Sequence, residues 1–273
     1  MAITTADGMV AEAIVPIRFN KNSILTSASA QAAGKSYWAS TGYPPAGSYS
    51  SSLNGSALSG TTTGAFNFPN PASGNTYLSR FEVSGSGTIA ATYLLCDRLW
   101  HNGGFTITST SAQSITSPTW PARDANGSTN GDGVLLALEM SVGTGSAAPT
   151  VTVSYTNSGG TAGRSATNIV TMAASTHRTG DAILLGLQGT DTGVRSVQSL
   201  TLSASWVTGT INLVAYRPIA MVGVGINGEW AEDAFTMLGP RIYDSSVLYL
   251  MSFANWSTSH ESTAGGMIQL AQG

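Results

Sequence analysis

The stretch Thr150-Val-Thr-Val-Ser-Tyr-Thr156 alternates hydroxyl side chains with apolar or aromatic ones. Successive side chains of a β strand point to opposite faces of the sheet, so this stretch presents one apolar face and one hydroxyl face. Phe105-Thr-Ile-Thr-Ser-Thr110 shows the same alternation. Both stretches therefore predict half-buried strands of an antiparallel sheet that packs one face against a core.

Other apolar segments extend this pattern along the chain, and turn signals such as Asn102-Gly-Gly and Asn157-Ser-Gly-Gly separate them. Helical periodicity is almost absent. The sequence therefore predicts an all-β fold, with antiparallel sheets arranged as a β-sandwich or in a jelly-roll-like way. The further predicted strands are Thr88–Leu95, Val134–Val142, Ala182–Leu187, Val197–Ser203, Thr210–Tyr216, Val247–Phe253 and Met267–Leu270.

The first 75 residues have a different character. Ile14–Phe19 is apolar but contains Pro16, which lacks a ladder donor, so we expect an edge strand or an arm. Residues 21–75 are rich in Ser, Gly, Ala, Thr and Pro. We expect an extended N-terminal arm or a long loop, which lies on its own domain or on a neighbouring subunit. Its aromatic anchors are Tyr37, Trp38, Tyr43, Tyr49, Phe66 and Phe68.

The C-terminal segment contains the one credible short helix, Glu229–Leu238, which Gly239-Pro240 would end. The chain thus divides into three predicted parts. These are an arm or loop region at 1–75, a β-sandwich core at 76–220, and a helix-plus-strands segment at 221–273 that packs on the core.

Composition restricts the classes of function. Only 9% of the 273 residues are charged, against about 25% in typical globular proteins, and the net charge is −3. No basic patch is visible, so we expect no nucleic-acid partner. No apolar run reaches the roughly 18 residues of a membrane span, so we expect no membrane partner. The N-terminus does not resemble a signal peptide, which predicts folding in a cytoplasm.

Cys96 is the single cysteine, so it cannot form an internal disulfide, and its apolar run predicts a buried structural thiol. Asp97-Arg-Leu-Trp100-His101 places acid and base neighbours around a histidine, but no G-x-S-x-G elbow accompanies them. We expect Asp97 to form a structural polar pair with Arg98 or Arg123. His177 and His260 have no ligand-like neighbours at metal spacing, and no catalytic residue is predicted.

Two motifs have weak matches to ligand sites. Gly223-Val-Gly-Ile-Asn-Gly228 fits G-x-G-x-x-G, but no βαβ alternation surrounds it, so we interpret it as a connection and expect no cofactor. Asp124–Asp132 places oxygen side chains at alternate positions, as a calcium loop does. Its glycine stands at loop position four, and Leu135 replaces the bidentate Glu. An inter-strand loop without metal explains the segment equally well, and calcium binding stays open.

Six tryptophans raise the possibility of stacking on sugars. Trp100, Trp120 and Trp206 lie in apolar segments and are expected in the core. Trp38 and Trp256 have polar surroundings, so they are the better candidates for surface anchors and for a carbohydrate-binding module.

Six stretches of residues 77–273 are distinctive: Tyr93–Gly104, Trp120–Gly133, Val153–Arg164, Asp191–Ser199, Pro240–Asp244 and Gln272-Gly273. Together they resemble a family of poorly characterised tailed-bacteriophage virion proteins that are encoded near head genes. The N-terminal 75 residues match less clearly. The resemblance implies a structural role in the virion, on the head, and brings no catalytic residues.

These observations predict a non-enzymatic capsid decoration or cement protein. It would bind the major capsid protein at a local symmetry point, as a trimer, and its arm would tie subunits together against the pressure of packaged DNA. A lysine-poor, hydroxyl-rich surface suits this role, since it can be buried at low desolvation cost. The alternatives are a neck, collar, tail or fibre component, and a carbohydrate-binding β-sandwich module.

Overall fold

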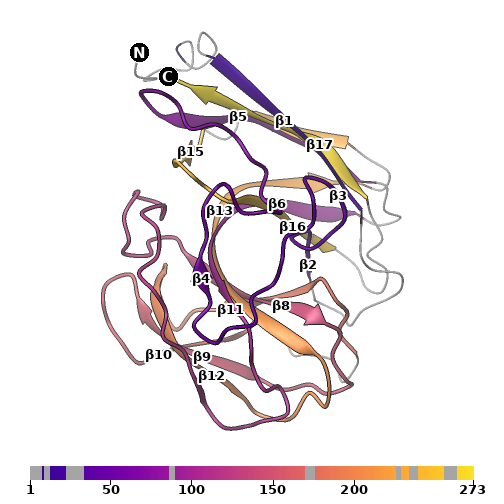
Figure 1. Cartoon of the computed structure of the whole chain (residues 1–273), viewed down its shortest axis with the longest axis vertical. Helices are drawn as coiled ribbons and strands as arrows, with labels where there is room; N and C mark the ends of the chain where they lie inside the picture. Colours follow the sequence, from indigo (N-terminus) through magenta and orange to yellow (C-terminus); the bar gives the residue numbers. More distant parts are fainter. Residues whose placement is uncertain are drawn as a thin grey trace.

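The structure is a computed structural model that describes residues 8, 13–22, 34–85, 90–169, 176–225, 229–233, 239–254 and 263–273. The elements with described bounds are all β strands, and they form two antiparallel sheets of 6 and 11 strands (Figure 1). The all-β, antiparallel prediction is therefore confirmed. The jelly-roll-like strand order is not confirmed.

The smaller sheet joins the two ends of the described chain. β1 pairs with β17 over its whole length, from Ala13 opposite Gln272 to Lys21 opposite Ala264. The strand order is β14-β5-β17-β1-β3, with β15 also on β5, and the sheet lies at the top of Figure 1. Its strands are β1 (Ala13–Lys21), β3 (Gly42–Tyr43), β5 (Thr76–Gly85), β14 (Glu229–Asp233), β15 (Arg241–Ile242) and β17 (Ala264–Gln272).

The larger sheet closes on itself. β2 pairs with both β16 and β11, so the strands β2-β16-β6-β13-β8-β11 form a closed barrel. The sheet continues from β11 through β10, β9, β12 and β7, and β4 adds to β6. The barrel strands are β2 (Gly34–Ser36), β6 (Ala91–Asn102), β8 (Leu135–Val142), β11 (Asp181–Gly186), β13 (Thr210–Val224) and β16 (Leu248–Ala254). The others are β4 (Ser56–Ala57), β7 (Gln113–Ser114), β9 (Val151–Asn157), β10 (Arg164–Asn168) and β12 (Val194–Leu202).

β2 closes the barrel because its first residue carries no side chain. A Cβ added at Gly34 would stand 2.1 Å from Cε1 of Phe253 on β16. Real Cβ atoms do not approach so closely, so a larger residue would push β2 away from its neighbour.

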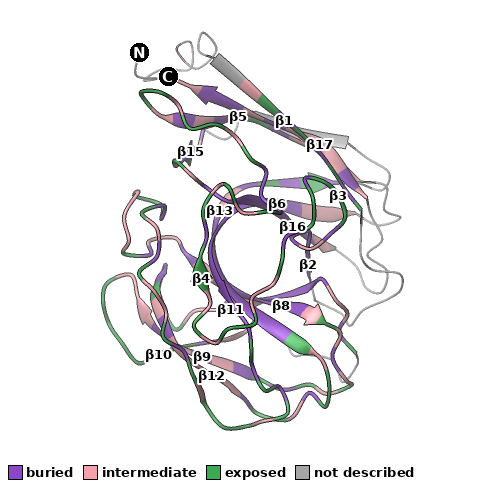
Figure 2. Ribbon diagram, viewed as in Figure 1, coloured by how far each residue is buried: buried purple, intermediate pink, exposed green. Residues whose placement is uncertain are grey.

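Three apolar clusters hold the sheets together. One lies among β8, β13, β9 and β12. A second lies between the smaller sheet and residues 93–95 of β6, 220–224 of β13 and 248–250 of β16. The third takes one or more side chains from each of β6, β8, β11, β13 and β16 and includes Trp38 and Cys96. The buried residues follow the central strands β6, β13 and β8 in Figure 2.

The segment from residue 34 to residue 75 packs on its own chain. Trp38 and Phe66 are buried, and backbone hydrogen bonds of 2.9 Å join Leu58 to Leu99 and Phe66 to Leu248. Most of the predicted aromatic anchors thus lie against the barrel, although Tyr43 is exposed. The prediction that Trp38 is a surface anchor is wrong, because its side chain is fully buried. Trp256 lies outside the described residues.

Two predicted elements differ in the structure. The helix predicted at Glu229–Leu238 is wrong where it is described, because Glu229–Asp233 forms β14 and pairs with Arg80–Ser84 of β5. The open edge of β5 offers ladder hydrogen bonds that outweigh local helix propensity. Phe105–Thr110 is a loop with a turn from Thr106 to Ser109 rather than a strand. Phe105 and Ile107 are nevertheless buried, so the alternation marks two anchors of a loop.

Candidate functional site

An ion pair lies inside the barrel. Arg98 Nη1 on β6 donates to Glu139 Oε1 on β8 over 2.8 Å, and both side chains are 0% exposed. The Arg98 guanidinium also lies over two aromatic rings, 4.5 Å from the centroid of Trp38 and 5.2 Å from that of Tyr249. Burying two charges is costly, and these contacts compensate for the lost hydration. The pair is therefore a fixed part of the barrel interior.

His101 extends this cluster toward the surface. Its Nδ1 lies 3.2 Å from Arg98 Nη2. A guanidinium only donates, so Nδ1 must accept, and the neutral imidazole then carries its proton on Nε2. Burial, and then the positive charge of Arg98, lower the pKa of His101 to about 3. The imidazole is thus a neutral group with a fixed tautomer.

His101 also lines a hollow beside residues 48–63, which we call the serine pocket. Its volume is about 460 Å³. None of the described residues donates to or accepts from His101 Nε2, so this N–H is available to the pocket. The other lining residues are uncharged: Ser48, Tyr49, Ser50, Ser51, Ser52, Ser56, Leu58, Thr62 and Thr63.

Three oxygen atoms of the barrel interior have no hydrogen-bond partner within the described part of the chain. They are Glu139 Oε2 and the hydroxyls of Tyr49 and Tyr249. Burial is the main cause that raises the pKa of both tyrosines, and the negative charge of Glu139 adds to it. The two tyrosines therefore remain protonated phenols near the Glu139 carboxylate. Their hydroxyls and the carboxylate make the interior of the barrel polar.

A second buried network fastens loops to the outside of the barrel. Asp97 accepts from Arg123 Nε over 3.1 Å, from Ser246 Oγ over 2.7 Å and from Val247 N over 2.9 Å. Arg123 also donates to the carbonyl oxygens of Leu58 and Arg98. The predicted polar pair of Asp97 with Arg123 is confirmed. All its strong acceptor positions are used structurally.

The loop Asp124–Asp132 is organised around one carboxylate. Asp124 is buried and accepts from the backbone N–H groups of Asn126, Ser128, Gly131 and Asp132, and from Ser128 Oγ over 2.6 Å. Burial alone would raise the pKa of Asp124, but these hydrogen bonds outweigh it and lower the pKa. Protein donors occupy the lone pairs that a calcium ion would need, which favours the inter-strand loop interpretation.

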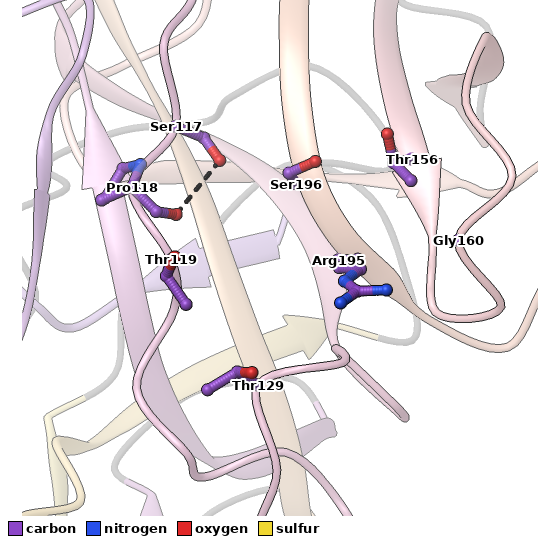
Figure 3. Close-up of a pocket in the computed structure, with 8 residues that line it drawn as sticks. All are labelled: Ser117, Pro118, Thr119, Thr129, Thr156, Gly160, Arg195 and Ser196. Carbon is purple, nitrogen blue, oxygen red and sulfur yellow. Dashed lines mark hydrogen bonds between the residues drawn. The ribbon is translucent and has the colours of Figure 1, made fainter.

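A second hollow, the Arg195 groove, lies between residues 117–129 and the strands β9 and β12, and has a volume of about 360 Å³ (Figure 3). Arg195 is exposed, and its guanidinium is the charged group among the lining residues. Ser117 Oγ donates to the carbonyl oxygen of Pro118, as drawn in Figure 3. The other lining residues are Thr119, Thr129, Thr156, Gly160 and Ser196.

His177 has a neighbour that the sequence interpretation overlooked. Its Nδ1 lies 3.6 Å from Oδ2 of Asp181, which is four positions along the chain and is the first residue of β11. Its ring meets Trp206 edge-on at 5.9 Å. The prediction that His177 has no carboxylate neighbour is therefore wrong, since the turn before β11 folds residues 177 and 181 together. His260 lies outside the described residues.

The buried-residue predictions are confirmed for Cys96, Trp100, Trp120 and Trp206. Burial raises the pKa of the Cys96 thiol, which makes it unreactive. The sequence interpretation missed Glu139, Tyr49 and Tyr249 as partners of Arg98. Glu139 carried a usable signal, because it is the charged residue in the apolar run Leu135–Met140.

Within the described ranges, no three His, Cys, Asp or Glu side chains gather closely enough to hold a metal ion. In the same part of the chain, no helix has the length and apolar character needed to cross a membrane. In the G-x-G-x-x-G motif, Gly223 is one of the last two residues of β13 and Gly225 directly follows the strand. The second half of the motif lies outside the described residues.

Comparisons with known proteins identify no family for this chain. No family model matches the chain, and no curated protein matches it. A solved structure to which the chain is similar is the crystal structure of the infectious bursal disease virus VP2 subviral particle. The identity is 9%, the match covers 100% of this chain and 83% of that chain, and the TM-score is 0.21. A TM-score this low supports no argument about fold or function.

Proposed function

We propose that this chain is a non-enzymatic structural protein of a tailed-bacteriophage virion, namely a decoration or cement protein. It binds the major capsid protein on the head surface as a trimer and stabilises the shell. The resemblance of residues 77–273 to virion proteins suggests the setting. The distribution of charge in the fold supports the role.

The observation that carries the proposal is that the chain has few charges and buries a large share of them. The sequence has 11 Lys and Arg and 14 Asp and Glu residues, and nine of them are buried in the described structure. Some charges, such as Arg80, Arg195 and Asp244, stay exposed, but the rest of the surface is rich in neutral hydroxyl and amide groups, which lose little on burial against a partner. Depletion of charge is typical of the central part of protein interfaces. The buried residues are Lys21, Lys35, Asp97, Arg98, Arg123, Asp124, Glu139, Asp181 and Arg217.

The cement role also requires a rigid subunit, and the buried networks supply rigidity. Arg98–Glu139 crosses the barrel, Asp97–Arg123 holds two loops, and Lys21 Nζ donates to the carbonyl oxygens of Ser40 and Pro44 over 3.0 and 2.7 Å. Interactions that join distant segments raise the cost of local opening. A subunit of this kind can transmit load between neighbours in a shell.

The copy number and position of the protein in purified virions test this proposal. Quantitative mass spectrometry and low-resolution cryo-imaging should find hundreds of copies over the whole head. A dozen or fewer copies at one vertex would instead identify a neck, collar, tail or fibre component. Absence from particles would overturn the virion role altogether.

A further inference from the structure

We infer that the serine pocket binds a neutral saccharide, with His101 Nε2–H as its fixed hydrogen-bond donor. This inference does not depend on the virion role. It begins with a contrast between the serine pocket and the Arg195 groove. The Arg195 groove presents a guanidinium, whereas the serine pocket has no charged lining residue.

His101 is the group that makes the serine pocket more than a surface dent. The side chain is 6% exposed, and its orientation is held by Arg98, which is itself held by Glu139. Trp38 also meets the imidazole edge-on, with ring centroids 6.2 Å apart. A buried ring that lines a hollow, with one nitrogen engaged and the other without a partner in the described part of the chain, is a preorganised donor. Preorganisation lowers the entropy cost of binding.

The walls of the pocket are also held in place. Ser50 N donates to Asn212 Oδ1 over 3.0 Å, and Gly103 N donates to the carbonyl oxygen of Ser52 over 3.0 Å. Ser48 accepts through its carbonyl oxygen from Trp38 Nε1 over 2.8 Å. The loop of residues 48–52 therefore keeps its shape when the pocket fills.

The lining chemistry selects the class of ligand. Seven Ser and Thr residues supply hydroxyls that both donate and accept, as the hydroxyls of a sugar do. Leu58 and the part of Tyr49 other than its buried hydroxyl supply apolar surface for the C–H face of a pyranose. A charged ligand would find no counter-charge among these residues. A peptide would find few apolar surfaces for its side chains.

The test uses the purified full-length chain and neutral oligosaccharides: maltotriose, lactose and chitotriose. Calorimetry measures affinity, and the ring ¹⁵N resonances of His101 report its tautomer and its contact with the sugar. At least one neutral sugar should bind and shift Nε2. The His101→Phe variant should weaken binding about five- to tenfold, the effect of one lost hydrogen bond. His101→Gln should rescue it, because the amide accepts from Arg98 and donates to the pocket.

Ser51→Phe fills the pocket from an exposed wall and leaves the buried cluster intact, so it serves if His101→Phe fails to fold. It should abolish binding. Thr119→Ala in the Arg195 groove is the matched control and should bind normally. Failure of all neutral sugars to shift His101 would overturn the inference. Preferential binding of an oligogalacturonate that Arg195→Gln abolishes, or of a peptide, would overturn it too.

Discussion

Individual side chains explain why this barrel carries charges inside. Arg98 and Glu139 are both 0% exposed, and Arg98 Nη1 donates to Glu139 Oε1 over 2.8 Å. A buried pair contributes little net stability by comparison with apolar residues, but breaking one half leaves an uncompensated charge. The energetic importance of the pair therefore shows in the single variants and disappears in the double variant.

We predict that Arg98→Met and Glu139→Leu each lower the free energy of unfolding by about 3–5 kcal/mol. The double variant should lose much less than the sum of the two, because no unpaired charge remains in the barrel. Urea unfolding of the four proteins gives the coupling free energy. Additive losses would show that the two side chains act independently and that the ion pair has no special role.

His101 gives the protein a dependence on pH. Its pKa is about 3 in the folded state, against about 6.5 for an unperturbed histidine. Below pH 6.5 the unfolded chain takes up a proton that the folded chain refuses, so stability falls as the pH falls toward 3. The slope should reach about 1.4 kcal/mol per pH unit from this group.

Urea unfolding of the wild type and of His101→Gln between pH 7 and pH 4.5 measures this slope. The variant should lose that part of the pH dependence, and the difference between the two curves isolates His101 from other titrating groups. A difference that stays constant with pH would mean that His101 protonates equally well in the folded state.

Val207 is a β-branched residue in the left-handed region, with φ of +68°, and it is 61% exposed. That conformation costs an L residue about 1–2 kcal/mol, whereas Asn adopts it readily. We predict that Val207→Asn raises the free energy of unfolding by about 0.5–1 kcal/mol. Val142→Asn is the matched control, since Val142 has a similar exposure of 54% but lies in the strand β8. Thermal unfolding checks both, and destabilisation by Val207→Asn would show that its side chain makes a stabilising contact.

At the scale of elements, the long alternating strands were predictable and the short ones were not. The strands predicted at Thr150–Thr156 and Val134–Val142 match β9 and β8 to within one residue at each end. This agreement is possible because side-chain alternation is a local property of the sequence. β2 has three residues and β4 has two, and their pairing depends on distant partners. Barrel closure therefore has no local signal. The same reason explains β14, which exists because β5 offers an edge.

The candidate site shows the same division. Asp97, Arg98 and His101 stood out in the sequence because charges are rare in an apolar strand. Their partners on β8 and β16 are separated from them by many residues, so only the fold brings Glu139 and Tyr249 to Arg98. Trp38 was misjudged because its sequence neighbours are polar, although it lies beneath Arg98.

The loop Asp124–Asp132 allows a test of whether its shape depends on the chain or on a metal. Asp124 accepts five hydrogen bonds within the loop, so Asp124→Ala leaves several donors unsatisfied. We predict a loss of about 2–4 kcal/mol in the free energy of unfolding. Millimolar calcium or a chelator should leave the thermal midpoint of the wild type unchanged. A rise in that midpoint with calcium would restore the metal-loop interpretation.

At the scale of the whole molecule, the chain has few charges and buries nine of its 25 Lys, Arg, Asp and Glu residues. The buried ion pair Arg98–Glu139 connects β6 to β8, and the pair Asp97–Arg123 fastens loops to the barrel. Neutral hydroxyl and amide groups cover much of the outside. Such a surface has weak long-range fields, so association depends on shape and burial rather than on charge steering.

This charge-poor surface leads to a prediction about assembly. If the chain binds a capsid through its neutral surface, its affinity for expanded capsids should change less than about threefold between 50 and 500 mM NaCl, since few ionic contacts are screened. Co-sedimentation with capsids across this range measures the effect. Urea unfolding at the same salt concentrations controls for changes in the fold. A steep loss of binding at high salt would place the interface on the remaining exposed charges, and the neutral surface would then have to serve another purpose.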